Sequence, residues 1–182
     1  MRPLGYMYKR VESRPDWLAA GRVGDIYSLS GCISVPFGDY IRHWKHNGFW
    51  LFDSPTDIQL LAKEISIELG GTKLFYYEAY EQEYDEDNHA WSAFDPEPSF
   101  VTNVSSPPQK HLEGYDVTTF AAHTSPECSP LSCNSLAVTI PTNAHCLFDT
   151  FEEARDALEA GAFNDSEPGP FRIIAVYSVN SL

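Results

Sequence analysis

Apolar residues in the first half of the chain occur in short runs with the spacing of strands and helices. Residues 6–11 and 24–30 have strand-like composition, and the apolar run at 49–52 indicates a short buried strand. In residues 37–46, large apolar side chains recur at i, i+3, i+4 and i+7, which places them on one helix face. The pattern therefore predicts two strands, a short amphipathic helix and a third strand.

A longer helix is predicted directly after this third strand. Ser54 can cap the helix, Pro55 suits its first turn, and Gly70 followed by Gly71 can end it. Its buried stripe consists of Ile58, Leu61, Ile65 and Leu69. Residues 73–83 are rich in aromatic side chains and predict a long strand after the helix.

The second half of the chain repeats short motifs of the first half in the same order. The motifs are Gly-Tyr at 5–6 and 114–115, a tetrapeptide ending in Cys at 29–32 and 130–133, and Leu-Phe-Asp followed by Ser or Thr at 51–54 and 147–150. The last motif supplies each half with a hydroxyl N-cap for a helix. Ordered matches of this kind indicate an internal duplication.

The end of the second half has its own helix and strand signals. Thr150 and Glu153 have the spacing of a capping box, and Gly161 can end the helix that they begin. Residues 171–179 are predicted to form a strand that corresponds to the aromatic strand of the first half. Both halves are therefore expected to end in a helix followed by a strand.

These elements predict an α+β fold built from two related β-β-α-β units. The first unit is expected to span residues 1–84, with the helix at 37–46 as an insertion, and the second unit residues 114–182. Residues 85–113 are acidic and rich in proline, and they are expected to form a connector packed on the body of the protein. Two related units in one chain favour a pseudo-twofold antiparallel or mixed sheet with the helices on one side.

Composition narrows the classes of function. The 182 residues include 12 Lys and Arg against 26 Asp and Glu, and the formal net charge of −14 excludes simple nucleic-acid binding through phosphates. The 4 Trp, 10 Tyr and 11 Phe argue against a disordered chain. No apolar run approaches the roughly 20 residues of a membrane helix, and the N-terminus lacks a signal-peptide pattern. A cytoplasmic protein without a membrane contact is expected.

The acidic side chains are concentrated in two segments. Residues 78–97 contain eight Asp and Glu with no Lys or Arg, and residues 152–167 carry only Arg155 against their acids. One interpretation is a solvated face that keeps the protein soluble. The other interpretation is a docking surface for a basic partner.

Tyrosines and carboxylates occur together where the aromatic strand runs into the first acidic segment. Such mixtures anchor protein interfaces and meet Arg and Lys side chains. The predicted partner-binding residues are Tyr80, Glu81, Glu83, Tyr84, Asp85, Glu86 and Asp87. Their carboxylates are expected to be solvated. The same pattern also fits an aromatic core strand with a polar end.

The main candidate for a chemical site is one window in the second half. Its residues are His123, Cys128, Cys133, His145 and Cys146. Zinc can be held by four such N and S donors, although the spacing lacks a C-x2-C pair. A cysteine beside a spatially close histidine can also act as a nucleophile. The other interpretation is that the cysteines are small buried side chains without a chemical role. The match of Cys133 with Cys32 favours this interpretation.

Two classes of function follow from these patterns. The first, which we favour, is an acidic interaction module without catalytic residues. An inhibitor or immunity-type antagonist that masks a basic site on a nucleic-acid-handling protein has this character. It needs a basic protein partner but no cofactor, no metal and no direct contact with nucleic acid. Common nucleotide and hydrolase motifs do not occur in the sequence, which also favours this first class. The second class is a small enzyme or zinc protein that uses the Cys/His window.

Overall fold

The computed structural model describes residues 1–29, 47–95, 102–119 and 128–180 of the chain. These residues form an α+β protein with an antiparallel sheet and a few helices, which confirms the predicted fold class. The helix predicted at 37–46 lies outside the described residues.

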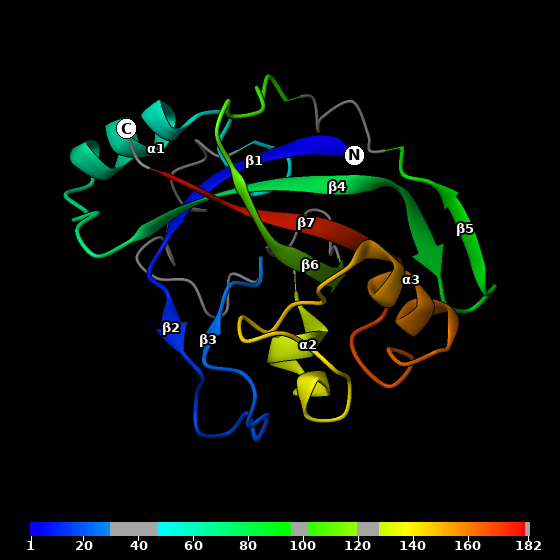
Figure 1. Ribbon diagram of the computed structural model, residues 1–182. Coiled ribbons are helices and arrows are strands. Elements are labelled where there is room, and N and C mark those ends of the chain that lie inside the picture. Colours follow the sequence, from blue (N-terminus) through cyan, green and yellow to red (C-terminus); the bar gives the residue numbers. More distant parts are fainter. Residues whose placement is uncertain (30–46, 96–101, 120–127, 181–182) are drawn as a thin grey trace.

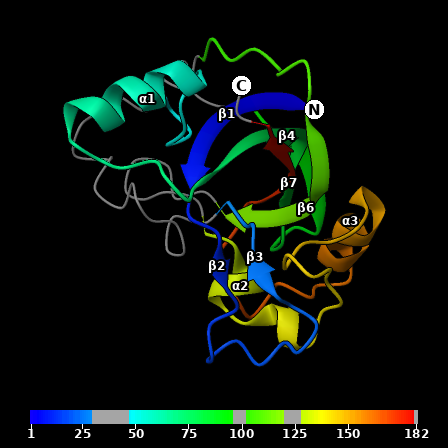
Figure 2. The ribbon, with the colours of Figure 1, turned by 60° about the vertical axis from the view of Figure 1, so that its left-hand side comes forward.

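Four long strands form the main sheet in the order β1-β4-β7-β6 (Figure 1). Their bounds are Arg2–Lys9 for β1, Lys73–Asp85 for β4, Phe171–Val179 for β7 and His111–Thr119 for β6. Each strand is antiparallel to its neighbours. The sheet is strongly twisted and curved (Figure 2), as the right-handed twist of individual strands requires.

Two smaller pieces of β structure extend this framework. β5 (Ala90–Ala93) folds back on the end of β4 as an antiparallel hairpin, so the predicted connector contains a strand. β2 (Glu12–Ser13) pairs with β3 (Asp25–Ile26) in a separate two-stranded ribbon. The predicted strand at 24–30 is therefore much shorter than expected.

The two main helices begin where their caps predict. α1 (Pro55–Glu64) follows Ser54, whose side chain accepts a hydrogen bond from the Asp57 backbone, and α3 (Phe151–Glu159) follows the predicted capping box. α1 nevertheless ends well before Gly70, because Ser66 adopts a left-handed backbone conformation with a φ of 59°. The chain then turns before β4.

Two short helical elements connect β6 to α3. They are α2 (Pro130–Cys133) and the 3-10 helix η4 (Leu136–Val138). A backbone pair between Thr119 and Cys128 brings the start of α2 against the end of β6. This contact positions the hydroxyl and thiol side chains of α2 beside the sheet.

The apolar run at 49–52 is buried but is not a strand. Trp50 has a φ of 59°, which interrupts extended structure, and only Phe52 pairs with a strand residue, Tyr6. The predicted strand at 6–11 also begins earlier, at Arg2, and the strand at 73–83 extends to Asp85. The last strand, Phe171–Val179, is confirmed at its predicted bounds.

The loops before α1 and α3 have the same hydrogen bonds. The side-chain oxygens of Asn47 and Asn143 each accept hydrogen bonds from backbone N–H groups two and four residues later. The side-chain amides donate to strand carbonyls, that of Leu4 in the first half and that of Glu113 in the second. The two asparagines therefore fix both loops to the sheet in the same way.

Backbone pairing between loop and strand is also the same in both halves. Phe52 exchanges two backbone hydrogen bonds with Tyr6, and Phe148 exchanges two with Tyr115. Each pair follows a glycine with an unusual backbone conformation, since φ is 147° at Gly5 and 146° at Gly114. Without a side chain, each glycine allows the loop to approach the strand closely.

Candidate functional site

The β4–β5 hairpin contains all of the predicted partner-binding residues. Glu81 and Asp87 are exposed, and Tyr80 is half-buried. Tyr84 is 2% exposed, and burial raises the pKa of its hydroxyl. The Tyr84 ring therefore belongs to the core of this end of the sheet, while Tyr80 remains partly accessible.

Three of the predicted carboxylates have bonding partners within the chain, and each remains partly exposed to solvent. Glu83 pairs with Arg172 at 3.2 Å, and Glu86 accepts a hydrogen bond from the Gly169 backbone at 2.6 Å. Asp85 accepts hydrogen bonds from the Asn88 side chain at 2.6 Å and from two backbone N–H groups of the turn. The bond from Asn88 contributes most to lowering the pKa of Asp85. Asp85 therefore stabilises the turn of the hairpin, whereas Glu83 and Glu86 connect the hairpin to β7 and to the segment before it.

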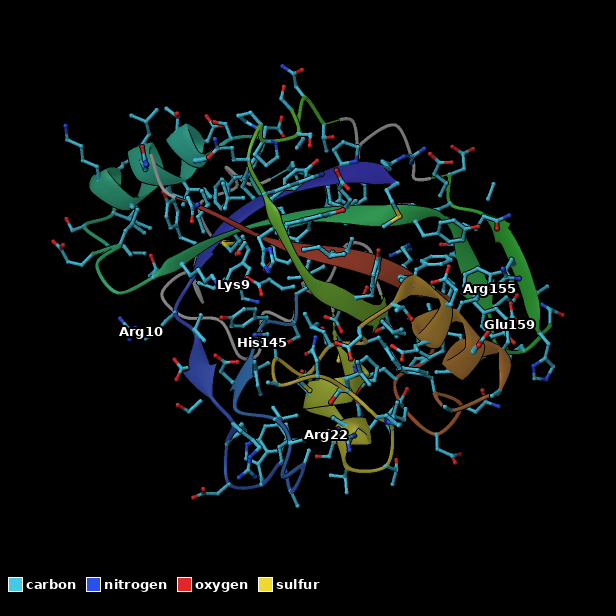
Figure 3. The ribbon with its side chains drawn as sticks, viewed as in Figure 1. Lys9, Arg10, Arg22, His145, Arg155 and Glu159 are labelled. Carbon is cyan, nitrogen blue, oxygen red and sulfur yellow. The ribbon has the colours of Figure 1, made fainter. Side chains whose placement is uncertain are left out.

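The second acidic segment meets the hairpin through α3. The indole N–H of Trp91 donates to Glu159 Oε1 at 2.8 Å, and the same oxygen accepts a hydrogen bond from Arg155 Nε at 2.7 Å. The two α3 side chains lie next to each other in Figure 3. The rings of Tyr80 and Phe151 pack edge to face with centroids 4.8 Å apart. Two acidic segments that are distant in sequence thereby form one surface.

We refer to this surface as the acidic face. It consists of half-buried aromatic rings surrounded by exposed carboxylates. Its residues are Tyr80, Glu81, Asp87, Trp91, Phe151, Glu152, Asp156 and Glu159. Carboxylates and aromatic faces both bind guanidinium and ammonium groups. Both acidic segments are evident in the sequence, but their adjacency is evident only in the folded structure.

The described residues of the Cys/His window do not come together as a metal-binding group. His123 lies outside the described residues, and Cys146 is fully buried, which raises the pKa of its thiol to about 12. The imidazole Nδ1 of His145 lies 2.5 Å from Asp25 Oδ1, and its ring stacks on Tyr27 at 3.9 Å. Within the described part of the chain, no group of three or more His, Cys, Asp and Glu residues is arranged to hold a metal ion.

A different polar group lies inside the protein beside Cys133, and we call it the buried polar cluster. Its members are Lys9, Ser28, Asp116, Ser129 and Ser132, each at most 4% exposed. The Lys9 ammonium donates to the Ser28 carbonyl, and the Ser28 and Ser132 hydroxyls are 3.2 Å apart. Ser132 Oγ also lies 3.9 Å from the sulfur of Cys133. The cluster joins β1, β6 and α2.

The two ionisable groups of the cluster have strongly perturbed pKa values. Burial lowers the pKa of Lys9 to about 7 and raises that of Asp116 to about 6. Asp116 Oδ2 accepts hydrogen bonds from Ser129 Oγ at 2.6 Å and from the Leu29 backbone at 2.9 Å. The other oxygen, Oδ1, is buried without a partner among the described residues. Such groups can exchange protons near neutral pH.

Neither Lys9 nor Asp116 was predicted from the sequence as a functional residue. The available signal for Lys9 was a charged residue within the strand predicted at 6–11, at a position where an apolar side chain is usual, whereas no strand was predicted around Asp116. Alternation alone does not distinguish a buried charge from an exposed one, because both faces of β1 and β6 carry buried residues.

A shallow hollow lies elsewhere, near the start of β6. Its lining consists of Pro107, Pro108, Gln109, Lys110, His111, Ser178 and Asn180. The Lys110 ammonium is directed to Glu78 at 2.6 Å and lies over the Tyr177 ring at 4.1 Å. The hollow therefore contains no residue of the acidic face or of the buried polar cluster.

Known proteins give no guide to the function of this site. No helix in the described part of the chain is long and apolar enough to cross a membrane. No family model, curated protein or solved structure matches the chain.

Proposed function

We propose that this protein is an acidic interaction module that binds a basic protein partner through the acidic face. It acts as an inhibitor or immunity-type antagonist in the cytoplasm, where it masks a basic site on a nucleic-acid-handling protein. It makes no direct contact with nucleic acid, because its own charge repels phosphates.

The observation that carries this proposal is the junction of the two acidic segments at α3. Exposed carboxylates surround half-buried aromatic rings there, and Arg155 is the sole Lys or Arg of residues 152–167. Arg155 is already paired with Glu159. A basic partner would gain ion pairs and cation–π contacts at this surface, and long-range attraction would accelerate its association.

Affinity capture from an extract of the source organism tests this proposal. The full chain is compared with a triple variant, Asp87→Asn, Glu152→Gln and Asp156→Asn, whose substituted side chains are exposed. The natural chain should retain a basic protein, and a DNA or RNA oligonucleotide should compete for that protein. The triple variant should lose most of the captured protein at low salt.

A matched control variant removes three charges from other surfaces. It carries Glu12→Gln, Asp16→Asn and Glu68→Gln, which lie near the β2–β3 ribbon and between α1 and β4. The control should capture the partner as the natural chain does. Equal losses in both triple variants would attribute capture to net charge alone and contradict a specific acidic face.

We also propose that the two halves are copies of one unit related by a pseudo-twofold axis. The repeated asparagine hydrogen bonds, glycine conformations and helix caps support this proposal. In this arrangement Gly5 pairs with Tyr77, as Gly114 pairs with Val176. In an experimental structure, superposing β1 and β4 on β6 and β7 should bring α1 onto α3. Unrelated helix positions would contradict the duplication.

A catalytic role for Cys133 is a second candidate, supported by the neighbouring buried Lys9, whose positive charge interacts favourably with a Cys133 thiolate. A neutral Lys9 amine can accept the thiol proton and so generate a nucleophilic thiolate. Alkylation by iodoacetamide, followed by peptide mass mapping, measures the reactivity of Cys133 against Cys128 as an internal reference. Lys9→Met should slow alkylation of Cys133 only, and an unchanged rate would contradict this role.

A further inference from the structure

β5 is the outer strand of the β4–β5 hairpin. It pairs with β4 on one side, and within the described residues no strand pairs with its other side. Figure 1 shows β5 along the right-hand margin of the molecule. The side chains of Ala90, Ser92 and Ala93 are exposed. The outer side of β5 is therefore an accessible sheet edge.

The pairing register identifies the backbone groups on this edge. The Phe94 N–H donates to the Glu81 carbonyl, and Ser92 lies opposite Glu83. Antiparallel pairs alternate between hydrogen-bonded and non-hydrogen-bonded positions. The backbone N–H and C=O groups of Phe94 and Ser92 point toward β4. The backbone N–H and C=O groups of Trp91 and Ala93 therefore point outward. These four groups have the spacing that an added antiparallel strand requires.

Two common blocks to strand pairing are absent from this edge. Natural edge strands are commonly blocked by Lys or Pro, and β5 contains neither. Its surroundings are acidic instead, since Asp87 and Asp95 flank the strand and Glu159 contacts Trp91. Acidic flanks repel a second copy of this edge but attract a strand that carries Lys or Arg.

From this edge we infer that the basic partner binds in an extended conformation, as an additional strand paired with β5. This inference rests on the proposed function and specifies how the partner is recognised. Main-chain hydrogen bonds to Trp91 and Ala93 would hold the segment, as in other cases of strand addition. Basic side chains on the same face as Trp91 would lie against its ring and near Glu159.

A synthetic peptide tests the inference with the full-length protein. The probe is a capped seven-residue peptide in which Lys alternates with Thr or Val. The control peptide has the same sequence with N-methyl groups on alternate backbone amides, so that its charge is unchanged but its edge donors are blocked. The unmethylated peptide should bind at least tenfold more tightly. It should also slow hydrogen exchange of the Trp91 and Ala93 amides.

A pair of variants tests the same edge from the protein side. Ala93→Pro removes an outward N–H and leaves the bonds to β4 in place, whereas Ala93→Val keeps that N–H. Binding of the unmethylated peptide should fall at least tenfold in Ala93→Pro and remain within about twofold in Ala93→Val. Circular dichroism and thermal unfolding check that both variants are folded. If Ala93→Pro fails to fold, strand addition is tested by comparing the methylated and unmethylated peptides on the natural chain.

Three other results of these binding experiments would contradict the inference. Salt-sensitive binding of both peptides with equal affinity would overturn strand addition but leave the acidic face as the binding surface. Absence of binding by either peptide at low salt would overturn the proposed function together with this inference. Dimerisation of the natural chain that Ala93→Pro abolishes would assign the edge to a second copy and also overturn the inference.

Discussion

At the scale of single residues, Gly5 and Gly114 show most directly why the chain uses particular amino acids. A Cβ atom on Gly114 would lie 2.5 Å from the Phe148 carbonyl oxygen, and one on Gly5 would lie 2.8 Å from that of Phe52. Both contacts are to backbone atoms, which cannot move away without breaking the loop–strand pair. The Gly-Tyr repeat seen in the sequence therefore marks two sites of close backbone approach.

Replacing either glycine by alanine should destabilise the protein by about 3 kcal/mol, because strain at the positive φ adds to the backbone contact. Urea unfolding of Gly5→Ala and Gly114→Ala measures the change. Gly70→Ala is the control, since a Cβ there meets nothing within 4 Å and the expected change is under about 0.5 kcal/mol. Losses no larger than that of the control would contradict this explanation.

Lys9 should make the stability depend on pH in a characteristic way. Its pKa is about 7 in the folded protein and 10.5 as the ordinary value. Between these values the unfolded chain binds the proton more strongly, so the free energy of unfolding rises with pH by about 1.4 kcal/mol per pH unit. Below pH 7, Lys9 is protonated in both the folded and the unfolded state. The free energy of unfolding is then lowered by the full cost of burying its ammonium group.

Urea unfolding between pH 7 and pH 9 measures this dependence in the natural chain and in Lys9→Met. The variant should lack the rise, so the difference between the two proteins should change steadily with pH. Lys63→Met is the control, because Lys63 is exposed on α1. The buried thiol of Cys146 has a raised pKa and acts in the opposite direction at the upper limit, but equally in all three proteins. Parallel curves for the natural chain and Lys9→Met would contradict the assigned titration.

At the scale of elements, local signals predicted both helix starts and the end of α3 at Gly161, but not the end of α1. The caps at Ser54 and Thr150 were predicted from neighbouring residues, because a cap bonds to backbone groups only two or three positions away. The end of α1 depends instead on the conformation of Ser66. The strand predicted at 49–52 was wrong for a similar reason, since the bonds of Asn47 hold that segment in a loop.

Removing the N-cap of α3 should moderately lower the stability of the protein. Thr150 Oγ1 accepts a hydrogen bond from the Glu153 backbone at 3.2 Å, and no residue replaces this acceptor in Thr150→Ala. The variant should lose about 1 kcal/mol of stability in thermal or urea unfolding. Ser13→Ala, on the exposed edge of β2, should be close to neutral. A neutral Thr150→Ala would show that packing alone maintains the helix start.

At the scale of the whole molecule, the charge of −14 is divided between carboxylates that stabilise the fold and carboxylates that face solvent. Glu83, Asp85 and Glu86 have bonding partners within the chain. Asp87 and Glu152 are exposed, and like-charge repulsion is their main effect on stability. Removing the same number of charges from the two groups should therefore change the stability of the protein by different amounts.

Two triple variants with the same net charge test this division. Glu83→Gln, Asp85→Asn and Glu86→Gln together should lower the melting temperature at low salt, because three internal bonds are weakened. Asp87→Asn, Glu152→Gln and Asp156→Asn together should leave it unchanged or raise it slightly. Differential scanning calorimetry at two salt concentrations provides the measurement. An equal fall in both variants would contradict separate roles.

The sequence by itself determined the α+β class, the helix starts, the final strand and the two acidic segments. These features depend on local periodicity, on capping over two or three residues, or on composition. Tertiary structure alone decided that the acidic segments meet at α3, that Tyr84 is buried, and that Lys9 and Asp116 share an interior cluster. These outcomes depend on the order and curvature of four strands, whose pairings join residues many positions apart. No local pattern specifies which distant carboxylate or amine each strand brings together.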